Sequence, residues 1–282
     1  MNQFQKKMAN FKLDKSRLLW SLFCIELVIL FFIGFETLFG IDFAKTVLIK
    51  LAELLPLILV ILHSFWTLSF PRGLFFLFLA AVIGFIGEYA SLNSFFHASF
   101  YKYNASLVTF LNVPVVVIVY WVVFAYLGYC LVNSFLFSLK KNKPAVKDKN
   151  FYLLPILVVA DGLVVVAVDL FMDPIGVKTG IWTWLVSGAY FGVPISNFFG
   201  WFKMIILITA IFRLYEYFNP LKTNNPNKSV FLMPAIGYAI LGLCFGFFAL
   251  TLKMYNLALI GSLIMLPIAF ASLLNYSLNR YK

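Results

Sequence analysis

Two aspartates, Asp169 and Asp173, are spaced four residues apart inside an apolar stretch of the chain. On an α-helix this spacing puts both carboxyl groups on one face, about one turn apart. Two like charges this close in a low dielectric should not both ionise, so we expect one of the pair to keep its proton. The residue before a proline avoids helical geometry, so we expect the helix to end near Asp173, just before Pro174. A carboxylate is disfavoured at the negative end of a helix dipole, which makes Asp173 a candidate acid that stays protonated near neutral pH.

Other polar and aromatic side chains are expected near this pair. A charged side chain costs about 2.5–3.5 kcal/mol at the centre of a spanning helix on insertion scales, so each one is a site hypothesis by default. Glu88 and Asn197 fall in the outer parts of two predicted spans, whereas Asp161 lies deeper and roughly 80° round the helix from Asp169. The aromatic candidates are Tyr101, Tyr103, Trp121, Trp182, Trp184, Tyr190 and Trp201.

Each of these residues also has a structural interpretation. An Asp-Pro pair is often a helix stop, tryptophans near an interface often form an aromatic belt, and Asn197 can bridge two helices. His97 is interpreted as a loop histidine without a catalytic role. Four further acidic residues have no aromatic or carboxylate neighbours in the sequence and are interpreted as structural or surface groups: Glu26, Glu36, Asp42 and Glu53. The case for a site depends on the co-occurrence of the candidates.

The composition indicates the kind of fold that must position these groups. The chain has 282 residues, of which 63% are hydrophobic and 12% charged, whereas soluble domains are about 45–50% apolar. A spanning helix needs about 20 apolar residues, and the sequence contains eight such runs, the second of them doubtful because of Lys50 and Glu53. We therefore predict an all-α, polytopic membrane bundle that forms one integral membrane domain over residues 1–282. The runs are 18–38, 46–68, 73–92, 110–138, 152–171, 190–212, 230–250 and 255–278.

The basic residues predict the orientation. An even number of spans puts both termini on one side, and most of the 22 Lys and Arg residues then fall on that side, Arg213 included. The positive-inside rule makes it the cytoplasmic side, so the candidate residues belong to the outer half. The lysine-rich segment 140–150 is predicted to be a cytoplasmic linker between two four-helix halves, and 219–228 a second cytoplasmic loop.

Several classes of site lack support in the sequence. The net charge of +11 is interpreted as a topology signal, and no basic-aromatic pattern suggests a nucleic-acid partner. Cys24, Cys130 and Cys244 occur singly in three spans, without a CxxC spacing, so neither a metal site nor a disulfide is predicted.

Two regions carry a resemblance to a known family. MDPIG, GIWTW and YFGVPISNFFGW, together with GFIGEYASLNS, FYKYN and LNVPVVVIVYW, resemble the membrane-bound carotenoid biosynthesis family that includes the carotenoid 1,2-hydratases and bisanhydrobacterioruberin hydratase. The resemblance covers roughly residues 84–205. It implies a hydro-lyase in a bacterial or archaeal cell membrane that adds water across the terminal carbon-carbon double bond of an acyclic carotenoid, giving a tertiary alcohol. The implied partner is the lipophilic carotenoid within the bilayer, and association with other carotenoid-pathway enzymes stays open.

The candidate residues suit this chemistry. Protonation of such an alkene gives a tertiary carbocation that water captures, and neither step requires a metal or an organic cofactor. Asp173 or Asp169 is the candidate acid, and tryptophan faces can stabilise the cation by up to about 2 kcal/mol each when desolvated. Glu88 and Asn197 are candidates to hold or deprotonate the water. We expect the polar candidates to line one cavity that opens toward the outer half of the bilayer, with an apolar tunnel for the polyene. The substrate-binding candidates are Trp182, Trp184, Tyr190, Asn197, Trp201, Tyr101, Tyr103 and Trp121.

Three alternatives remain open. A carotenoid end-group cyclase or isomerase shares the protonation step but excludes water. A prenyltransferase would use the DLFMD stretch for a diphosphate, although such sites usually need two acidic motifs. A transporter or a carotenoid-binding scaffold is the alternative from another class, and matching broken helices in the two halves would favour transport.

Overall fold

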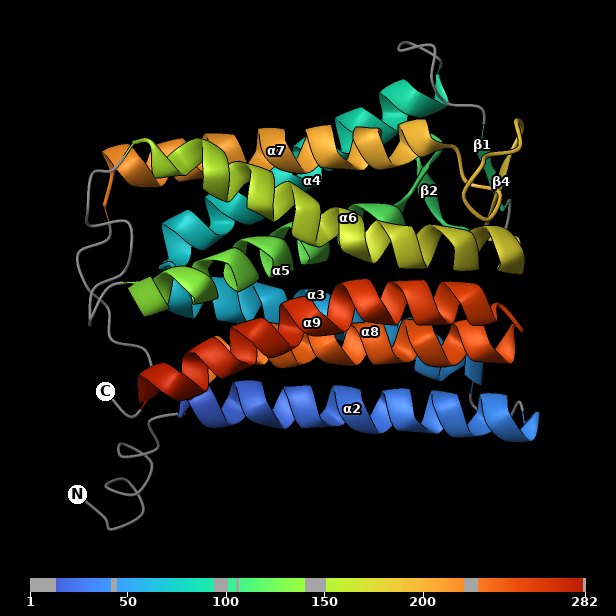
Figure 1. Cartoon of the computed structure of the whole chain (residues 1–282), viewed down its shortest axis with the longest axis horizontal. Coiled ribbons are helices and arrows are strands. Elements are labelled where there is room, and N and C mark those ends of the chain that lie inside the picture. The colour runs from blue at the N-terminus through green and yellow to red at the C-terminus, as the bar shows by residue number, and fades with distance from the viewer. Residues whose placement is uncertain are drawn as a thin grey trace, which may run out of the picture.

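The protein folds into a bundle of long, roughly aligned helices, as the computed structural model shows (Figure 1). The structure describes residues 14–41, 45–93, 101–104, 107–139, 151–220 and 228–280. Within these ranges, eight helices are long and apolar enough to cross a membrane, which confirms the all-α polytopic fold. They are α2 (Lys15–Phe39), α3 (Lys45–Thr67), α4 (Phe70–Leu92), α5 (Val115–Leu139), α6 (Leu153–Thr179), α7 (Ile195–Phe218), α8 (Met233–Thr251), preceded by the short 3-10 helix η2 (Lys228–Leu232), and α9 (Tyr255–Arg280).

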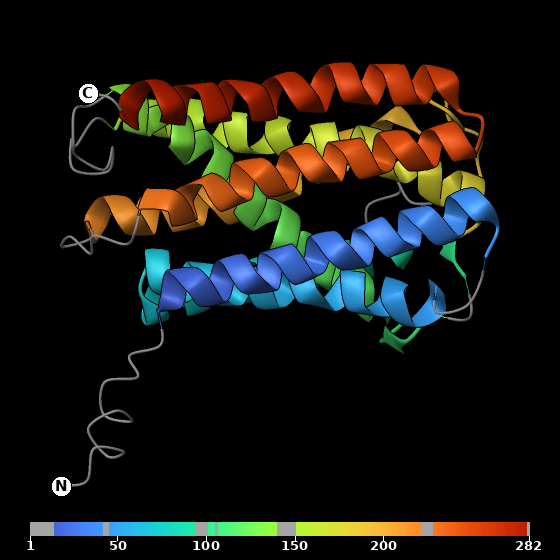
Figure 2. The same cartoon turned by 90° about the horizontal axis from the view of Figure 1, so that it is seen from below.

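Each of the eight helices overlaps one hydropathy run, although α6 and α7 continue past the ends of their runs. A helix suits each run because every backbone polar group in a bilayer must be satisfied within its own helix. The doubtful second run is a spanning helix, α3, and Pro56 lies inside it. α5 is the most buried span and crosses the bundle obliquely, visible between α8 and α2 in Figure 2. Asp42, His97 and the predicted linker 140–150 lie outside the described residues.

Helix α6 differs from the prediction at its C-terminal end. It continues through Pro174 to Thr179 and ends at Gly180, whose φ of 74° is left-handed. Proline lacks an N–H, so one backbone carbonyl in the preceding turn loses its helical donor, but a membrane helix tolerates this loss where neighbouring groups satisfy the carbonyl. The expected helix end at Asp173 is therefore wrong, and the helix-dipole argument for Asp173 does not apply.

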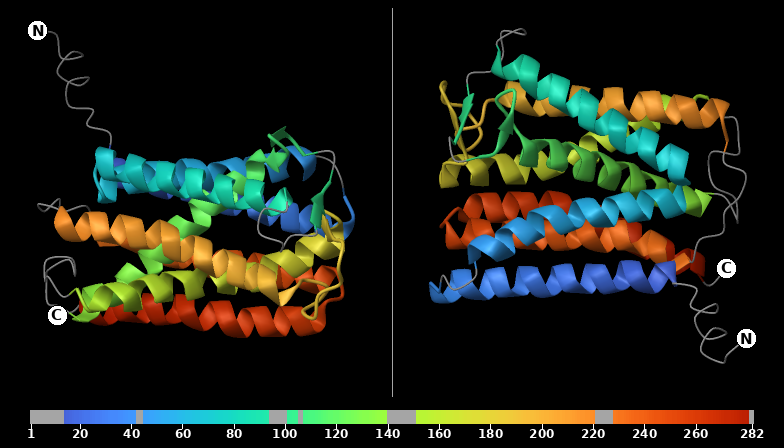
Figure 3. Two further views of the ribbon diagram at one scale, coloured as in Figure 1. Left: turned by 90° about the horizontal axis from the view of Figure 1, so that it is seen from above. Right: turned by 180° about the vertical axis from the view of Figure 1, so that it is seen from behind.

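Two small antiparallel sheets lie at one end of the bundle and were not predicted. β1 (Tyr101–Tyr103) pairs with β4 (Trp182–Trp184), and β2 (Thr109–Phe110) pairs with β3 (Val113–Pro114). Each strand has only two or three residues, too few for alternation to stand out in a sequence. Figure 3 shows the pairs at the same end from two further sides. α2 begins and α9 ends at the opposite end (Figure 1).

The orientation in the membrane yields the first prediction. Because the sequence assigns most Lys and Arg residues to the side of the membrane on which α2 begins, we expect that side to be the cytoplasm. Reporter fusions at residues 145 and 180 should then report opposite sides of the membrane, with 145 inside. Fusions that report one side for both positions would contradict the topology.

Candidate active site

The candidate active site is a cavity beneath the β1–β4 sheet. Helices α4 to α7 supply its walls, so both predicted four-helix halves contribute to it. The cavity volume is about 30 Å³, and a polar cavity needs about 10–15 Å³ to hold one ordered water. The cavity therefore has room for ordered water in this conformation. Its lining residues are Glu88, Tyr101, Tyr103, Val117, Tyr120, Met172, Asp173, Trp182, Trp184, Asn197 and Trp201.

Glu88 accepts three hydrogen bonds at one wall of the cavity. The hydroxyls of Tyr101 and Tyr103 donate to its Oε2 at 2.5 and 2.9 Å, and the indole N–H of Trp121 donates to Oε1 at 3.0 Å. A carboxylate has about four lone-pair positions, so the three donors found among the described residues leave one position free. Since that position belongs to Oε1, the carboxylate can accept one more donor, such as a water.

The two tyrosines remain proton donors. Both lie on β1, outside the spanning helices, and burial together with the neighbouring Glu88 carboxylate raises the pKa of Tyr101 and Tyr103 well above the ordinary value of a phenol. Their alternation with the exposed Lys102 points both rings to the same face of the strand. The strand therefore presents two phenol O–H groups to one carboxylate.

Asp169 and Asp173 form a second acidic group, on α6. Both are buried, and their carboxyl groups are in hydrogen-bond contact. The two N–H bonds of the Asn197 amide reach Oδ2 of both residues, at 3.1 Å for Asp169 and 2.5 Å for Asp173. Two buried carboxyl groups in contact need a proton between them, so this pair is able to supply one. Asp173 faces the cavity and Asp169 lies behind it.

Aromatic rings form the remaining walls. The register of the sheet places Tyr101 opposite Trp184 and Tyr103 opposite Trp182, with ring centroids 4.9 and 6.2 Å apart. Trp201 lines the cavity and stacks on Trp121 at a centroid distance of 4.0 Å and an interplanar angle of 17°. Trp121 thus connects the aromatic wall to Glu88, since the same ring donates its N–H to the carboxylate.

A family model described as carotenoid biosynthesis protein matches residues 48–268, a range that contains every residue of the cavity. The chain belongs to this family. Membership in the carotenoid biosynthesis family confirms the resemblance to that family and supports a role in carotenoid biosynthesis. No curated protein and no solved structure matches the chain significantly.

The structure brings together most of the residues that the sequence singled out in this carotenoid biosynthesis protein. Asp169 and Trp121 lie directly behind the cavity, each in contact with a residue that lines it. Tyr190 is not among the lining residues, and its ring packs edge-on against Phe191 and Phe198. The candidates that line the cavity are Glu88, Tyr101, Tyr103, Asp173, Trp182, Trp184, Asn197 and Trp201.

Sequence reasoning missed three lining residues and one residue behind them. Val117 and Met172 are ordinary apolar side chains, so no signal in the sequence marks them. Tyr120 directly precedes Trp121 and carries a hydroxyl inside a span, which was an available signal. Glu53, interpreted as a structural or surface group, is in hydrogen-bond contact with Tyr120, so it belongs to the surroundings of the cavity.

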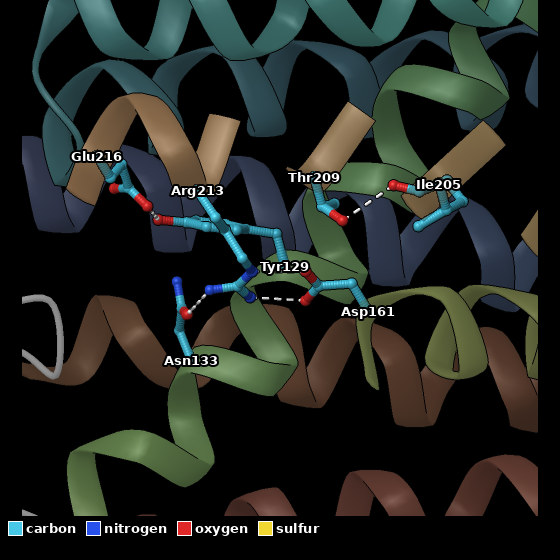
Figure 4. A network of polar contacts seen from close by, with 7 residues as sticks. All are labelled: Tyr129, Asn133, Asp161, Ile205, Thr209, Arg213 and Glu216. Atoms are coloured by element: carbon cyan, nitrogen blue, oxygen red, sulfur yellow. Dashed lines mark hydrogen bonds and ion pairs between the residues drawn. The ribbon is translucent and has the colours of Figure 1, made fainter. Parts of the chain in front are cut away.

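A separate polar cluster lies deeper, between α5, α6 and α7 (Figure 4). Arg213 donates from Nε and Nη2 to the two carboxylate oxygens of Asp161, both at 2.6 Å, and from Nη1 to Asn133 at 2.9 Å. Its guanidinium also lies over the ring of Tyr129, 4.7 Å from the centroid. Tyr129 in turn donates to Glu216 at 2.8 Å. Arg213, counted above among the cytoplasmic basic residues, is therefore a buried residue of α7 and carries no topology signal.

Metal ligation was not predicted for this chain. Among the residues that the structure describes, no group of three or more His, Cys, Asp or Glu is placed to hold a metal ion. The three cysteines are free and belong to three different helices, α2, α5 and α8.

The contact between α6 and the sheet yields a second prediction. A Cβ added at Gly176 would lie 2.1 Å from Cζ2 and 2.4 Å from Cε2 of Trp182. Since the indole is rigid and buried, we expect Gly176→Ala to displace Trp182 and with it the β1–β4 sheet. The yield of the carotenoid product per inserted protein should fall, measured by chromatography of extracted pigments.

Gly200→Ala is the matched control. Gly200 is also helical, on α7, and nothing lies within 4 Å of a Cβ added there. This variant should keep wild-type yield, because alanine favours a helix over glycine by about 1 kcal/mol. Equal yields from the two variants would show that Trp182 has no role in holding the cavity.

Proposed function

We propose that this carotenoid biosynthesis protein is a hydratase that adds water across the terminal C=C bond of an acyclic carotenoid end group. The observation that carries the proposal is the pairing of two different acidic groups at one cavity. Asp173, in contact with Asp169, belongs to a pair that needs a proton, and Glu88 has one acceptor position free. Alkene hydration requires one group of each kind, a proton donor and a water acceptor.

The first step is protonation by Asp173. Its carboxyl proton forms a C–H bond with the less substituted alkene carbon, using the electron pair of the C=C bond. The other carbon becomes a tertiary cation, and Asp173 becomes a carboxylate. The Asn197 amide, already 2.5 Å from Asp173 Oδ2, stabilises this new charge with a hydrogen bond to the charged form.

The aromatic walls suit the cation. Trp182, Trp184 and Trp201 line the cavity, and an indole face attracts a nearby cation by up to about 2 kcal/mol when water is excluded. The Glu88 carboxylate adds an opposite charge to the same cavity.

The second step is capture of the cation by water. A water that donates one hydrogen to the free position of Glu88 Oε1 directs a lone pair into the cavity. Its oxygen forms the C–O bond, and its proton passes to Glu88. The product is a tertiary alcohol whose new C–H hydrogen comes from Asp173 and whose O–H group comes from the water, so the net addition is one water.

The size of the cavity limits what it can hold. With a volume of about 30 Å³, it admits an isoprenoid end group only after the aromatic side chains move apart. The polyene must then extend from the cavity toward the bilayer, and the apolar tunnel expected for it remains a prediction.

A cyclase or isomerase would use the same protonation step, but it must exclude water from the cation. A polar cavity with room for water, and a carboxylate with a free acceptor position, favour hydration over these alternatives. A transporter or scaffold would have no need of an acid that faces an acceptor across a small cavity.

Expression in a host that accumulates an acyclic carotenoid tests the proposal. With the protein present, mass spectrometry of extracted pigments should show products heavier by one water, and growth in ¹⁸O-labelled water should place the label in the new hydroxyl. An isomeric product of unchanged mass would indicate the cyclase or isomerase. Unchanged pigments, with the protein inserted, would refute all of the enzymatic assignments.

A further inference from the structure

We propose that the hydroxyl of Tyr101 returns the proton from Glu88 to Asp173 after each hydration, so that the active site is reset without exchange with bulk water. This inference rests on the proposed function, because it concerns the same cavity and the same two carboxyl groups. It assigns to Tyr101 a catalytic role in turnover, distinct from binding of the substrate.

The need for a return path follows from the proton balance. One hydration leaves Asp173 as a carboxylate and Glu88 as a carboxylic acid, although the reaction consumes no net proton. A second hydration cannot start until Asp173 has a proton again. The protein therefore needs a route by which one proton leaves Glu88 and one reaches Asp173.

Few of the groups around the cavity can serve as this route. The indole N–H of a tryptophan and the amide N–H of Asn197 are donors without a lone pair that accepts a proton. A phenol has both an O–H bond and free lone pairs, which leaves Tyr101, Tyr103 and Tyr120 among the lining residues. Tyr120 is in contact with Glu53, on the α3 side, so two tyrosines remain.

The surroundings of the two tyrosines differ. Tyr101 donates to Glu88 Oε2 at 2.5 Å and also interacts electrostatically with Asp173. Tyr103 donates to the same oxygen at 2.9 Å, but its electrostatic partners are Glu88 and Tyr101. Tyr101 is thus the phenol that donates the shorter hydrogen bond to Glu88, lines the same cavity as Asp173 and is influenced by its charge.

The transfer is a concerted exchange. Rotation of the Glu88 carboxyl group first brings the protonated Oε1 to Tyr101, which contacts Oε2 beforehand. The Glu88 O–H bond then breaks as its proton binds the phenol oxygen of Tyr101, while the original Tyr101 O–H bond breaks and its proton binds Asp173, directly or through one cavity water. No electrons are gained or lost, and both carboxyl groups return to their starting states. A free tyrosinate is not formed, consistent with a buried phenol whose pKa is raised well above its ordinary value.

Comparison of the first turnover with later ones tests the inference. Purified full-length protein in lipid vesicles is mixed in excess with an acyclic carotenoid for a single turnover, or with excess carotenoid for many turnovers. Tyr101→Phe should keep a first turnover within a few-fold of wild type and then slow by about 100-fold, the low end for loss of a proton-transfer group. The time course should show a burst of one alcohol per enzyme.

Tyr103→Phe is the matched control, since it removes a donor to the same Glu88 oxygen but leaves the Tyr101 hydroxyl in place. It should show no burst. A Tyr101→Phe variant that slows the first and later turnovers equally, or slows neither, would overturn the inference. If Tyr101→Phe does not insert, Tyr101→His and Tyr101→Leu replace it: only the leucine variant should show a burst, because imidazole can accept one proton as it gives another.

The outcome separates this inference from the proposed function. Wild-type protein that forms no alcohol in either format refutes the hydratase itself. Wild-type protein that turns over, beside a Tyr101→Phe variant without a burst, refutes only the relay.

Discussion

Asp173→Asn is expected to abolish hydration while the protein remains folded and inserted. Asparagine keeps the size of aspartate and an oxygen that can accept the Asn197 hydrogen bond, now 2.5 Å long. An amide, however, cannot deliver the proton that starts the reaction. The alcohol formed per unit of inserted protein should therefore fall by at least about 100-fold, the low end for a general acid.

The structure sharpens this test. If Asp173 only ended a helix, asparagine would replace it well, but α6 continues to Thr179 and that interpretation no longer applies. The remaining structural role of Asp173 is to accept a hydrogen bond from Asn197, and the side-chain oxygen of an asparagine can still accept that bond. Loss of turnover with normal insertion would then report the missing proton.

Asp169→Asn is the comparison variant. Asp169 contacts Asp173 but does not line the cavity, so its replacement should leave a larger residual activity than Asp173→Asn does. Near wild-type turnover in Asp173→Asn would move the acid role to Asp169 or to Glu88. Asp169→Asn and Glu88→Gln would then identify which of the two carries it.

The fold was largely predictable from the sequence because the bilayer imposes one periodicity and one length on each span. The limits of each span also indicate how deep each polar residue lies in the bilayer. This depth alone predicted that Glu88, Asp173 and Asn197 lie at one end of the bundle. Hydropathy carries no information about which helices are neighbours, so the sequence did not predict that Trp121 connects Glu88 to Trp201.

The misses have separate physical causes. The YKY and WTW stretches alternate between aromatic and polar residues, but three residues are too few to predict a strand, and pairing between distant loops leaves no local signal. Pro174 was expected to end a helix because helices in water usually end just before a proline. There, water solvates the backbone carbonyl that loses its helical N–H donor. Arg213 was counted with the cytoplasmic basic residues because the sixth hydropathy run ends at residue 212, and its partner Asp161 lies 52 residues away in the sequence.

The Asp161–Arg213 pair carries the largest expected effect on stability. Arg213→Leu should destabilise the protein by about 3–5 kcal/mol, because it leaves the Asp161 carboxylate buried without its partner. Asp161→Leu should cost a similar amount by leaving the guanidinium uncompensated. Unfolding of the purified protein in mixed micelles, followed by circular dichroism, measures both.

The double variant Asp161→Leu/Arg213→Leu separates pairing from packing. Two apolar side chains leave no buried charge in place of the pair, and such replacements are often neutral or stabilising, so most of the lost stability should return. Glu216 keeps its 2.8 Å hydrogen bond from Tyr129 in all three variants. Because Asp161 lies 12 residues before Asp173 on α6, about 18 Å along the helix, the double variant should retain turnover per folded protein.

A double variant as unstable as either single one would show that the Asn133 and Tyr129 contacts of Arg213, and not its charge pairing, hold α5, α6 and α7 together. A stable double variant without turnover would show instead that the ion pair sets the register of α6 against α7, and through it the position of Asn197 beside the two aspartates.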